Sequence, residues 1–144
     1  MLIVTPSSIP PRFSSLSGTL GTLLGQTVKA DRILLDIPRR YRRFPDWDGV
    51  LPEVPAGVEI RRCEQDYGPA TKILPPAFEF RGQDCFILFC DDDRLYPKDW
   101  PQHFLKASRE RPNCCIASSG LEAIRWSPVV RTALSSRVPF VVGA

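Results

Sequence analysis

The sequence predicts an α/β fold with a mostly parallel β-sheet, and two observations support this. An apolar segment, an amphipathic segment with helical spacing and a second apolar segment follow one another within residues 2–37. A strand–helix–strand unit is parallel and right-handed by default. Later in the chain, an apolar run at residues 85–90 leads directly into three aspartates. Such a run is typical of a central strand buried on both faces.

The first strand–helix–strand unit is expected to end near residue 37. Leu2–Val4 is predicted to form its first strand and Ile33–Ile37 its second. Between them, apolar side chains recur at helical spacing over residues 13–26, which predicts an amphipathic helix. The two prolines after the first strand fix φ, so the helix is expected to start no earlier than about Arg12.

The rest of the chain predicts a long surface connection over residues 38–57, rich in proline and basic residues, and then further regular elements. These are an edge strand at residues 58–63 and a short helix at residues 71–80, which two prolines must break or distort. The central strand at residues 85–90, a further helix at residues 97–110 and a last strand at residues 113–120 follow. Residues 121–144 give an ambiguous pattern. The 144 residues suit a single domain, or one lobe of a larger protein.

The composition is that of an ordinary soluble globular protein, with 43% apolar and 24% charged residues. A net charge of +3 is too weak to indicate nucleic-acid binding, although Arg39, Arg40, Arg42 and Arg43 form a local basic cluster. No apolar stretch is long enough to span a membrane, and the start of the chain lacks the charged region of a signal peptide.

Five cysteines and one histidine give little support for a zinc site, because no Cys-x-x-Cys pair occurs. The odd number of cysteines, most of them in apolar runs, favours reduced and buried thiols. A cytoplasmic location is therefore expected.

The three aspartates after the central strand are the leading candidates for chemistry. Unpaired carboxylates cannot be buried cheaply, so Asp91, Asp92 and Asp93 are expected at the carboxyl end of the strand, where α/β sheets bind ligands. The oxygens of Asp91 and Asp93 suit a hard cation such as Mg²⁺ or Mn²⁺. The alternative is a solvated acidic turn. A phosphate-binding P-loop is missing from the sequence, which argues against an ATPase of that class.

Two other segments are expected to face the same crevice. In residues 66–72, Gly68 permits a tight turn with positive φ, and Thr71 and Lys72 would project from a helix start that favours an anion. Thr5–Pro6 and Arg12 lie at the end of the first strand and near the start of its helix. A solvated lysine and a surface ion pair of Arg12 are the alternatives.

In order and spacing, these motifs resemble the nucleotide-binding half of a GT-A-type glycosyltransferase over roughly residues 1–120. The segments that carry the resemblance are Val4–Thr5–Pro6 with Ile9–Arg12, Ile33–Pro38, Asp66–Lys72, and Asp91–Asp93 followed by Tyr96–Pro97. The resemblance implies a Rossmann-like α/β/α sandwich. Residues 1–144 would then form one GT-A-like nucleotide-sugar-binding domain whose acceptor half is short or absent.

The resemblance also implies roles for individual residues. Asp93 would be the best metal ligand, assisted by Asp91, with Mn²⁺ or Mg²⁺ as the cofactor. The residues expected to contact the nucleotide-sugar donor are Thr5, Pro6 and Asp36 near the nucleoside, Arg12 and Lys72 near the diphosphate, and Asp66, Asp91 and Asp92. The implied reaction transfers a sugar from a nucleoside-diphosphate sugar to an acceptor hydroxyl while the metal holds the departing diphosphate.

The second half of such an enzyme is the open question. After Asp99 the only acids are Glu110 and Glu122, so either Glu122 is the catalytic base of a minimal enzyme or the acceptor half is absent. The apolar end of the chain favours absence. The alternatives are a non-catalytic nucleotide-sugar-binding remnant and a sugar-phosphate nucleotidyltransferase, although residues 7–11 offer no glycine-rich loop for the latter. An exposed sheet edge would also permit a homo-oligomer.

Overall fold

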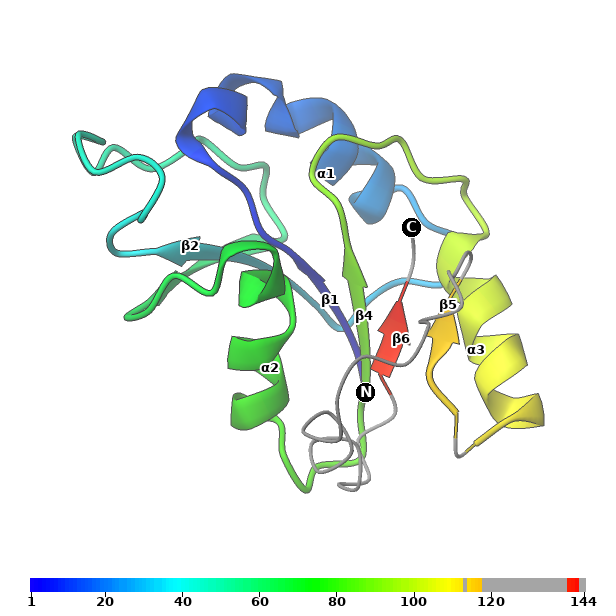
Figure 1. Cartoon of the computed structure of the whole chain (residues 1–144). Coiled ribbons are helices and arrows are strands. Elements are labelled where there is room, and N and C mark those ends of the chain that lie inside the picture. Colours follow the sequence, from blue (N-terminus) through cyan, green and yellow to red (C-terminus); the bar gives the residue numbers. More distant parts are fainter. Residues whose placement is uncertain (113, 118–139, 143–144) are drawn as a thin grey trace, which may run out of the picture.

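The computed structural model describes residues 1–112, 114–117 and 140–142 as an α/β structure (Figure 1). Its strands, helices and 3-10 helices (labelled η) follow one another as β1 (Leu2–Pro6), η1 (Pro10–Ser15), α1 (Leu16–Leu24), β2 (Arg32–Pro38), β3 (Val58–Cys63), η2 (Gly68–Lys72), α2 (Leu74–Glu79), β4 (Phe86–Cys90), α3 (Trp100–Glu110), β5 (Ile116–Ala117) and β6 (Phe140–Val142).

The strands form one sheet in the order β3-β2-β1-β4-β6-β5, and every described pairing is parallel. The chain moves outward from β1 to β3 and then returns to the other side of β1 with β4. The order therefore reverses between β1 and β4, which is where open α/β sheets bind ligands. The predicted parallel α/β fold is confirmed, as are the central place of β4 and the edge position of β3.

Helices cover both faces of the sheet, which gives three layers. Leu16, Leu20 and Leu23 of α1 pack with Trp100 and Phe104 of α3 against one face. On the other face, Phe80, which ends α2, packs against the strand residues Ile3, Leu34 and Ile87. Successive strand side chains alternate between these cores, because they point to opposite faces of the sheet.

Prolines that were predicted to prevent or break a helix instead lie in the first turn of one. Pro10 and Pro11 occupy the first turn of η1, so helical structure begins before Arg12. A first turn tolerates proline because its N–H groups have no partner within the helix. For the same reason Pro75 and Pro76 begin α2, and the predicted helix 71–80 is divided into η2 and α2 at Ile73. The predicted break is confirmed, but it precedes the prolines.

The five cysteine side chains differ in burial. All five cysteines are free, and Cys63, Cys85 and Cys90 are buried as expected. Cys114 and Cys115 are exposed, so the prediction of buried thiols is wrong for these two. In the part of the chain that the structure describes, no helix combines the length and apolarity needed to cross a bilayer.

Candidate functional site

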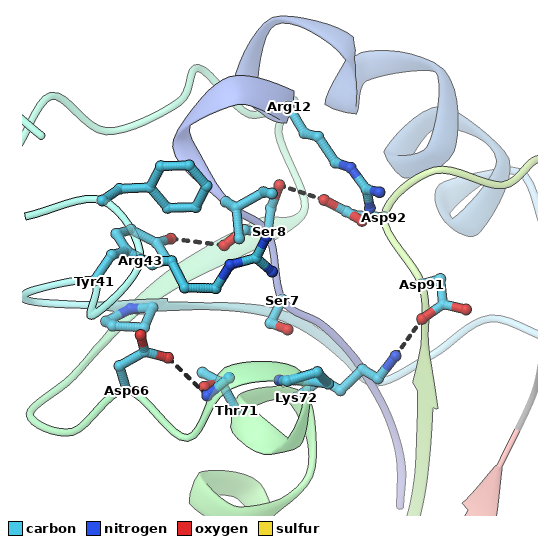
Figure 2. Close-up of a pocket in the computed structure, with 15 residues that line it drawn as sticks. Ser7, Ser8, Arg12, Tyr41, Arg43, Asp66, Thr71, Lys72, Asp91 and Asp92 are labelled. Atoms are coloured by element: carbon cyan, nitrogen blue, oxygen red, sulfur yellow. Dashed lines mark hydrogen bonds and ion pairs between the residues drawn. The ribbon is translucent and has the colours of Figure 1, made fainter.

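A cavity of about 280 Å³ lies at the carboxyl ends of β1 and β4, where the strand order reverses. The segment after β2 and the 3-10 helix η2 form its other walls (Figure 2). Its lining residues are Ser7, Ser8, Ile9, Arg12, Pro38, Tyr41, Arg43, Phe44, Asp66, Gly68, Pro69, Thr71, Lys72, Asp91 and Asp92.

The three aspartates after β4 have three different environments. Asp92 is 5% exposed and accepts hydrogen bonds from Ser8 Oγ (2.5 Å) and Arg12 Nη1 (2.8 Å). Asp91 is half-buried and pairs with Lys72. The side chain of Asp93 is 48% exposed and lies 3.1 Å from Arg12 Nη1. All three follow the carboxyl end of β4, as expected, and Asp92 can be buried there because its partners offset the cost of burial.

Arg12 joins the first strand's loop to this acidic turn. The proline-started 3-10 helix η1 carries Arg12, and its Nη1 lies between an Asp92 and an Asp93 oxygen. The hydrogen bond to Asp92 and the negative charge of that carboxylate raise the pKa of Arg12 above its ordinary value. The alternative of an isolated surface ion pair does not describe Arg12, because one of its partners is buried.

The predicted metal pair, Asp91 and Asp93, does not converge on one point in this arrangement. Asp91 pairs with Lys72, whereas Asp93 pairs with Arg12. Within the described residues, no three His, Cys, Asp or Glu side chains gather as a metal site. The donor chemistry nevertheless suits Mg²⁺, which needs one or two carboxylates when substrate phosphates supply further oxygens. Asp91 and Asp93 would have to release Lys72 and Arg12 before they hold such an ion.

Lys72 reaches the cavity from the end of η2, which β1 holds in place. The hydroxyl of Thr5 donates to the carbonyl of Lys72 over 2.7 Å. Thr71 is buried, and its hydroxyl accepts the backbone N–H of Tyr67 (3.1 Å). The structure thus places Thr5 beneath the site, where it positions Lys72, and turns the Thr71 hydroxyl toward its own turn.

Asp66 fastens the long segment after β2 to the turn that begins η2. Its carboxylate accepts the backbone N–H groups of Arg42 (2.9 Å) and Gly68 (2.7 Å). The predicted positive φ of Gly68 is confirmed at +59°. These two hydrogen bonds hold the segment after β2 in a fixed position against the cavity, although that segment has no regular secondary structure.

Tyr41, Arg43 and Phe44 line the cavity and were not among the predicted site residues. The buried Tyr41 hydroxyl donates to the carbonyl of Ser8 (2.6 Å), and burial raises its pKa above the ordinary value. Arg43 lies 5.8 Å from the Phe44 ring centre. Two sequence signals pointed toward this wall, namely the basic cluster at residues 39–43 and the length of the connection at residues 38–57.

The remaining predicted residues lie elsewhere. Thr5 and Pro6 do not line the cavity. Asp36 is fully buried and faces the α2 side of the sheet, where Arg61 donates to both its oxygens (2.8 and 2.9 Å). Burial raises the pKa of Asp36 to about 6, and Arg61 only partly opposes this. Glu122 lies outside the described residues.

The cavity brings opposite charges together. Arg12, Lys72 and Arg43 supply positive charge, against Asp66, Asp91 and Asp92. Among the described residues, Arg43 is the lining cation that makes no ion pair. The site can thus offer one cation directly to an anionic ligand, and two more when their aspartates are otherwise neutralised.

Comparison with known proteins adds no assignment to this geometry. No protein-family model matches the sequence, and no curated protein matches it either.

Proposed function

We propose that this chain binds a nucleoside-diphosphate sugar and serves as the donor-binding domain of a metal-assisted glycosyltransferase of the GT-A type. The observation that carries the proposal is the meeting of Arg12, Arg43 and Lys72 with the aspartate turn in one cavity at the reversal of strand order. Cations beside carboxylates at this edge suit a ligand that combines phosphates with polar hydroxyl groups.

The diphosphate is the part of the donor that these cations fit best. Arg43 is free of ion pairs among the described residues, and a guanidinium binds phosphate oxygens with two parallel hydrogen bonds. Lys72 supplies a second charge from η2. Its pairing with Asp91 keeps the ammonium group at the cavity in the absence of a ligand (Figure 2).

The aromatic wall suits the nucleoside. Tyr41 and Phe44 pack edge to face with ring centres 6.0 Å apart, and both line the cavity. Drug-sized ligands occupy pockets of roughly 300–1,000 Å³. The cavity, at about 280 Å³, is just below that range, so it would enclose the diphosphate and part of the nucleoside. The sugar would extend from its open mouth.

In the proposed transfer, an acceptor hydroxyl attacks the anomeric carbon and the bond from that carbon to the diphosphate oxygen breaks. When bound, Mn²⁺ or Mg²⁺ would stabilise the negative charge that develops on the diphosphate, with Asp91 and Asp93 as its ligands. Arg12 and Lys72, released from those aspartates, would face the same charge. Glu122 remains a prediction for the base that accepts the hydroxyl proton.

A non-catalytic donor-binding module is the second candidate. The ion pairs of Asp91 and Asp93 favour it, because both carboxylates are already neutralised by protein cations. Such a module would bind nucleotides without metal and would neither hydrolyse nor transfer the sugar. A sugar-phosphate nucleotidyltransferase has less support, since Ser7–Pro11 leads into a proline-started 3-10 helix with no glycine-rich loop.

Calorimetric titration with UDP, GDP and their sugars, with and without Mn²⁺, tests the proposal. We expect Mn²⁺-dependent binding that Asp93→Ala abolishes. Asp84→Ala is the matched control, because Asp84 is an exposed acid outside the cavity. Binding without metal that Asp93→Ala leaves unchanged would favour the non-catalytic module. No binding of any nucleotide under either condition would overturn the donor-site assignment.

A further inference from the structure

A second cavity, of about 450 Å³, lies in the segment that follows β2. Tyr41 and Phe44 line both cavities, so the two adjoin. This segment projects beyond the end of β2, where Figure 1 shows it as the cyan loop. The residues that line the second cavity are Arg39, Arg40, Tyr41, Phe44, Pro45, Trp47, Asp48 and Gly49.

Positive charge is concentrated at this segment. Arg39, Arg40, Arg42 and Arg43 fall within five residues, and Asp46 and Asp48 offset only part of their charge. Arg39 pairs with Glu64 (2.5 Å), with both side chains mostly exposed. Arg40 and Arg42 are exposed and form no ion pair with any described residue. Their charge is therefore available to an anionic partner.

Two apolar side chains near the end of the same segment face water. Val50 is 63% exposed and Leu51 is 39% exposed, and they directly follow Gly49 of the cavity lining. Water contact of this kind has a cost of roughly 25 cal/mol for each Å² of apolar surface. A soluble anion would leave these side chains in water, whereas a lipid bilayer would cover them.

The segment is anchored, so it presents these side chains without first having to fold. The backbone N–H of Arg42 donates to Asp66, and the ring centres of Trp47 and Tyr41 lie 5.2 Å apart in an edge-to-face contact. The guanidinium of Arg62 also lies 5.3 Å from the centre of the Trp47 ring. A preorganised surface loses less conformational entropy on binding.

We propose that residues 39–51 dock this domain on the surface of an anionic lipid bilayer. Arg40 and Arg42 would contact head-group phosphates, while Val50 and Leu51 would enter the interface between head groups and acyl chains. The second cavity has room for a head group. This docking does not depend on the proposed donor site, although it would bring that site close to acceptors carried by lipids.

Flotation of the full chain with vesicles tests the docking. The vesicles contain phosphatidylcholine alone or phosphatidylcholine with phosphatidylglycerol. We expect binding only to the anionic vesicles, weakening as salt screens the charges. Arg40→Gln/Arg42→Gln should weaken binding by about fivefold for each arginine. Val50→Ser/Leu51→Ser should weaken it by about tenfold through lost apolar burial.

Matched controls separate docking from general charge and apolarity. Arg81→Gln/Arg109→Gln removes the same charge from exposed sites outside the segment, and Phe78→Ser removes an exposed apolar side chain from α2. Both control variants should bind like the wild type. No binding to anionic vesicles at low salt would overturn the proposal. So would unchanged binding of Val50→Ser/Leu51→Ser, or a preference for heparin or RNA over vesicles, because a polyanion site would then explain the arginines.

Discussion

Replacing Asp92 with alanine tests whether the aspartate turn anchors the first loop to the sheet. Asp92 is 5% exposed and accepts from Ser8, which is itself 5% exposed, and from Arg12. Its own backbone carbonyl accepts the hydroxyl of Thr19 in α1 (2.9 Å), a bond that does not require the carboxylate. Asp92→Ala therefore removes the two side-chain bonds and leaves the Thr19 contact in place.

The expected loss follows from the burial of each partner. A hydrogen bond to a charged group contributes about 1.5–3 kcal/mol, and leaving the buried Ser8 hydroxyl unpaired puts the loss toward the upper end. The pairing with Arg12 adds at most about 1 kcal/mol, because the Arg12 side chain is 45% exposed and solvent screens it. We expect Asp92→Ala to lower the free energy of unfolding by about 3 kcal/mol.

Urea unfolding monitored by circular dichroism measures this loss, and Asp93→Ala is the matched control. With a urea dependence of about 2 kcal/mol/M, the Asp92→Ala midpoint should fall by about 1.5 M. Asp93→Ala should lose less than about 1 kcal/mol, because the Asp93 side chain is 48% exposed. Equal and small losses in the two variants would refute the anchoring role of Asp92.

Three further outcomes are expected. Lys72→Met should weaken UDP or GDP binding by about 10- to 100-fold in calorimetry, since a charge-assisted hydrogen bond is lost; unchanged affinity would place the diphosphate elsewhere. Asp36 has a native pKa raised to about 6, so it stabilises the fold fully below about pH 4 and this stabilisation is lost as the pH rises through 6. Relative to Asp36→Asn, the wild type should lose on the order of 3 kcal/mol between pH 4 and 7 in urea unfolding, and parallel profiles would contradict this. Gly57→Ala should cost about 1–2 kcal/mol in the same assay, because φ is +96° and the added Cβ would lie 2.9 Å from Leu24 Cδ2; wild-type stability would show that the backbone relaxes.

Local patterns were enough to predict the frame of this fold. The apolar run before Asp91 identified β4 as a central strand, and the alternation at residues 58–63 identified an edge strand. Each of these two patterns reflects how the side chains of one short segment are buried, so each can be recognised within that segment alone. A parallel βαβ unit then follows from general handedness, which is why the loop after β1 and the aspartates after β4 could be expected at the same edge of the sheet. The strand order itself came only from the structure.

Side-chain direction could not be predicted in the same way. Around Asp36 the strand is apolar on both faces, so the sequence has no alternation that would show which face the carboxylate joins. The inward turn of Asp92 depends on Ser8, which is distant in the sequence. Tyr41 and Arg43 reach the site because Asp66 ties their segment to η2, a contact that no periodic pattern reports.

Mapping the nucleotide site on isotope-labelled protein by NMR tests the central claim most directly. Backbone amide shifts would be followed during titration with UDP or GDP in the presence of Mg²⁺, which avoids the paramagnetic broadening caused by Mn²⁺. We expect the largest changes at Ser8, Arg43, Gly68, Lys72 and Asp91, which surround the cavity on separate elements. Large changes confined to residues outside this set, or none at saturating nucleotide, would contradict a donor site at the reversal of strand order.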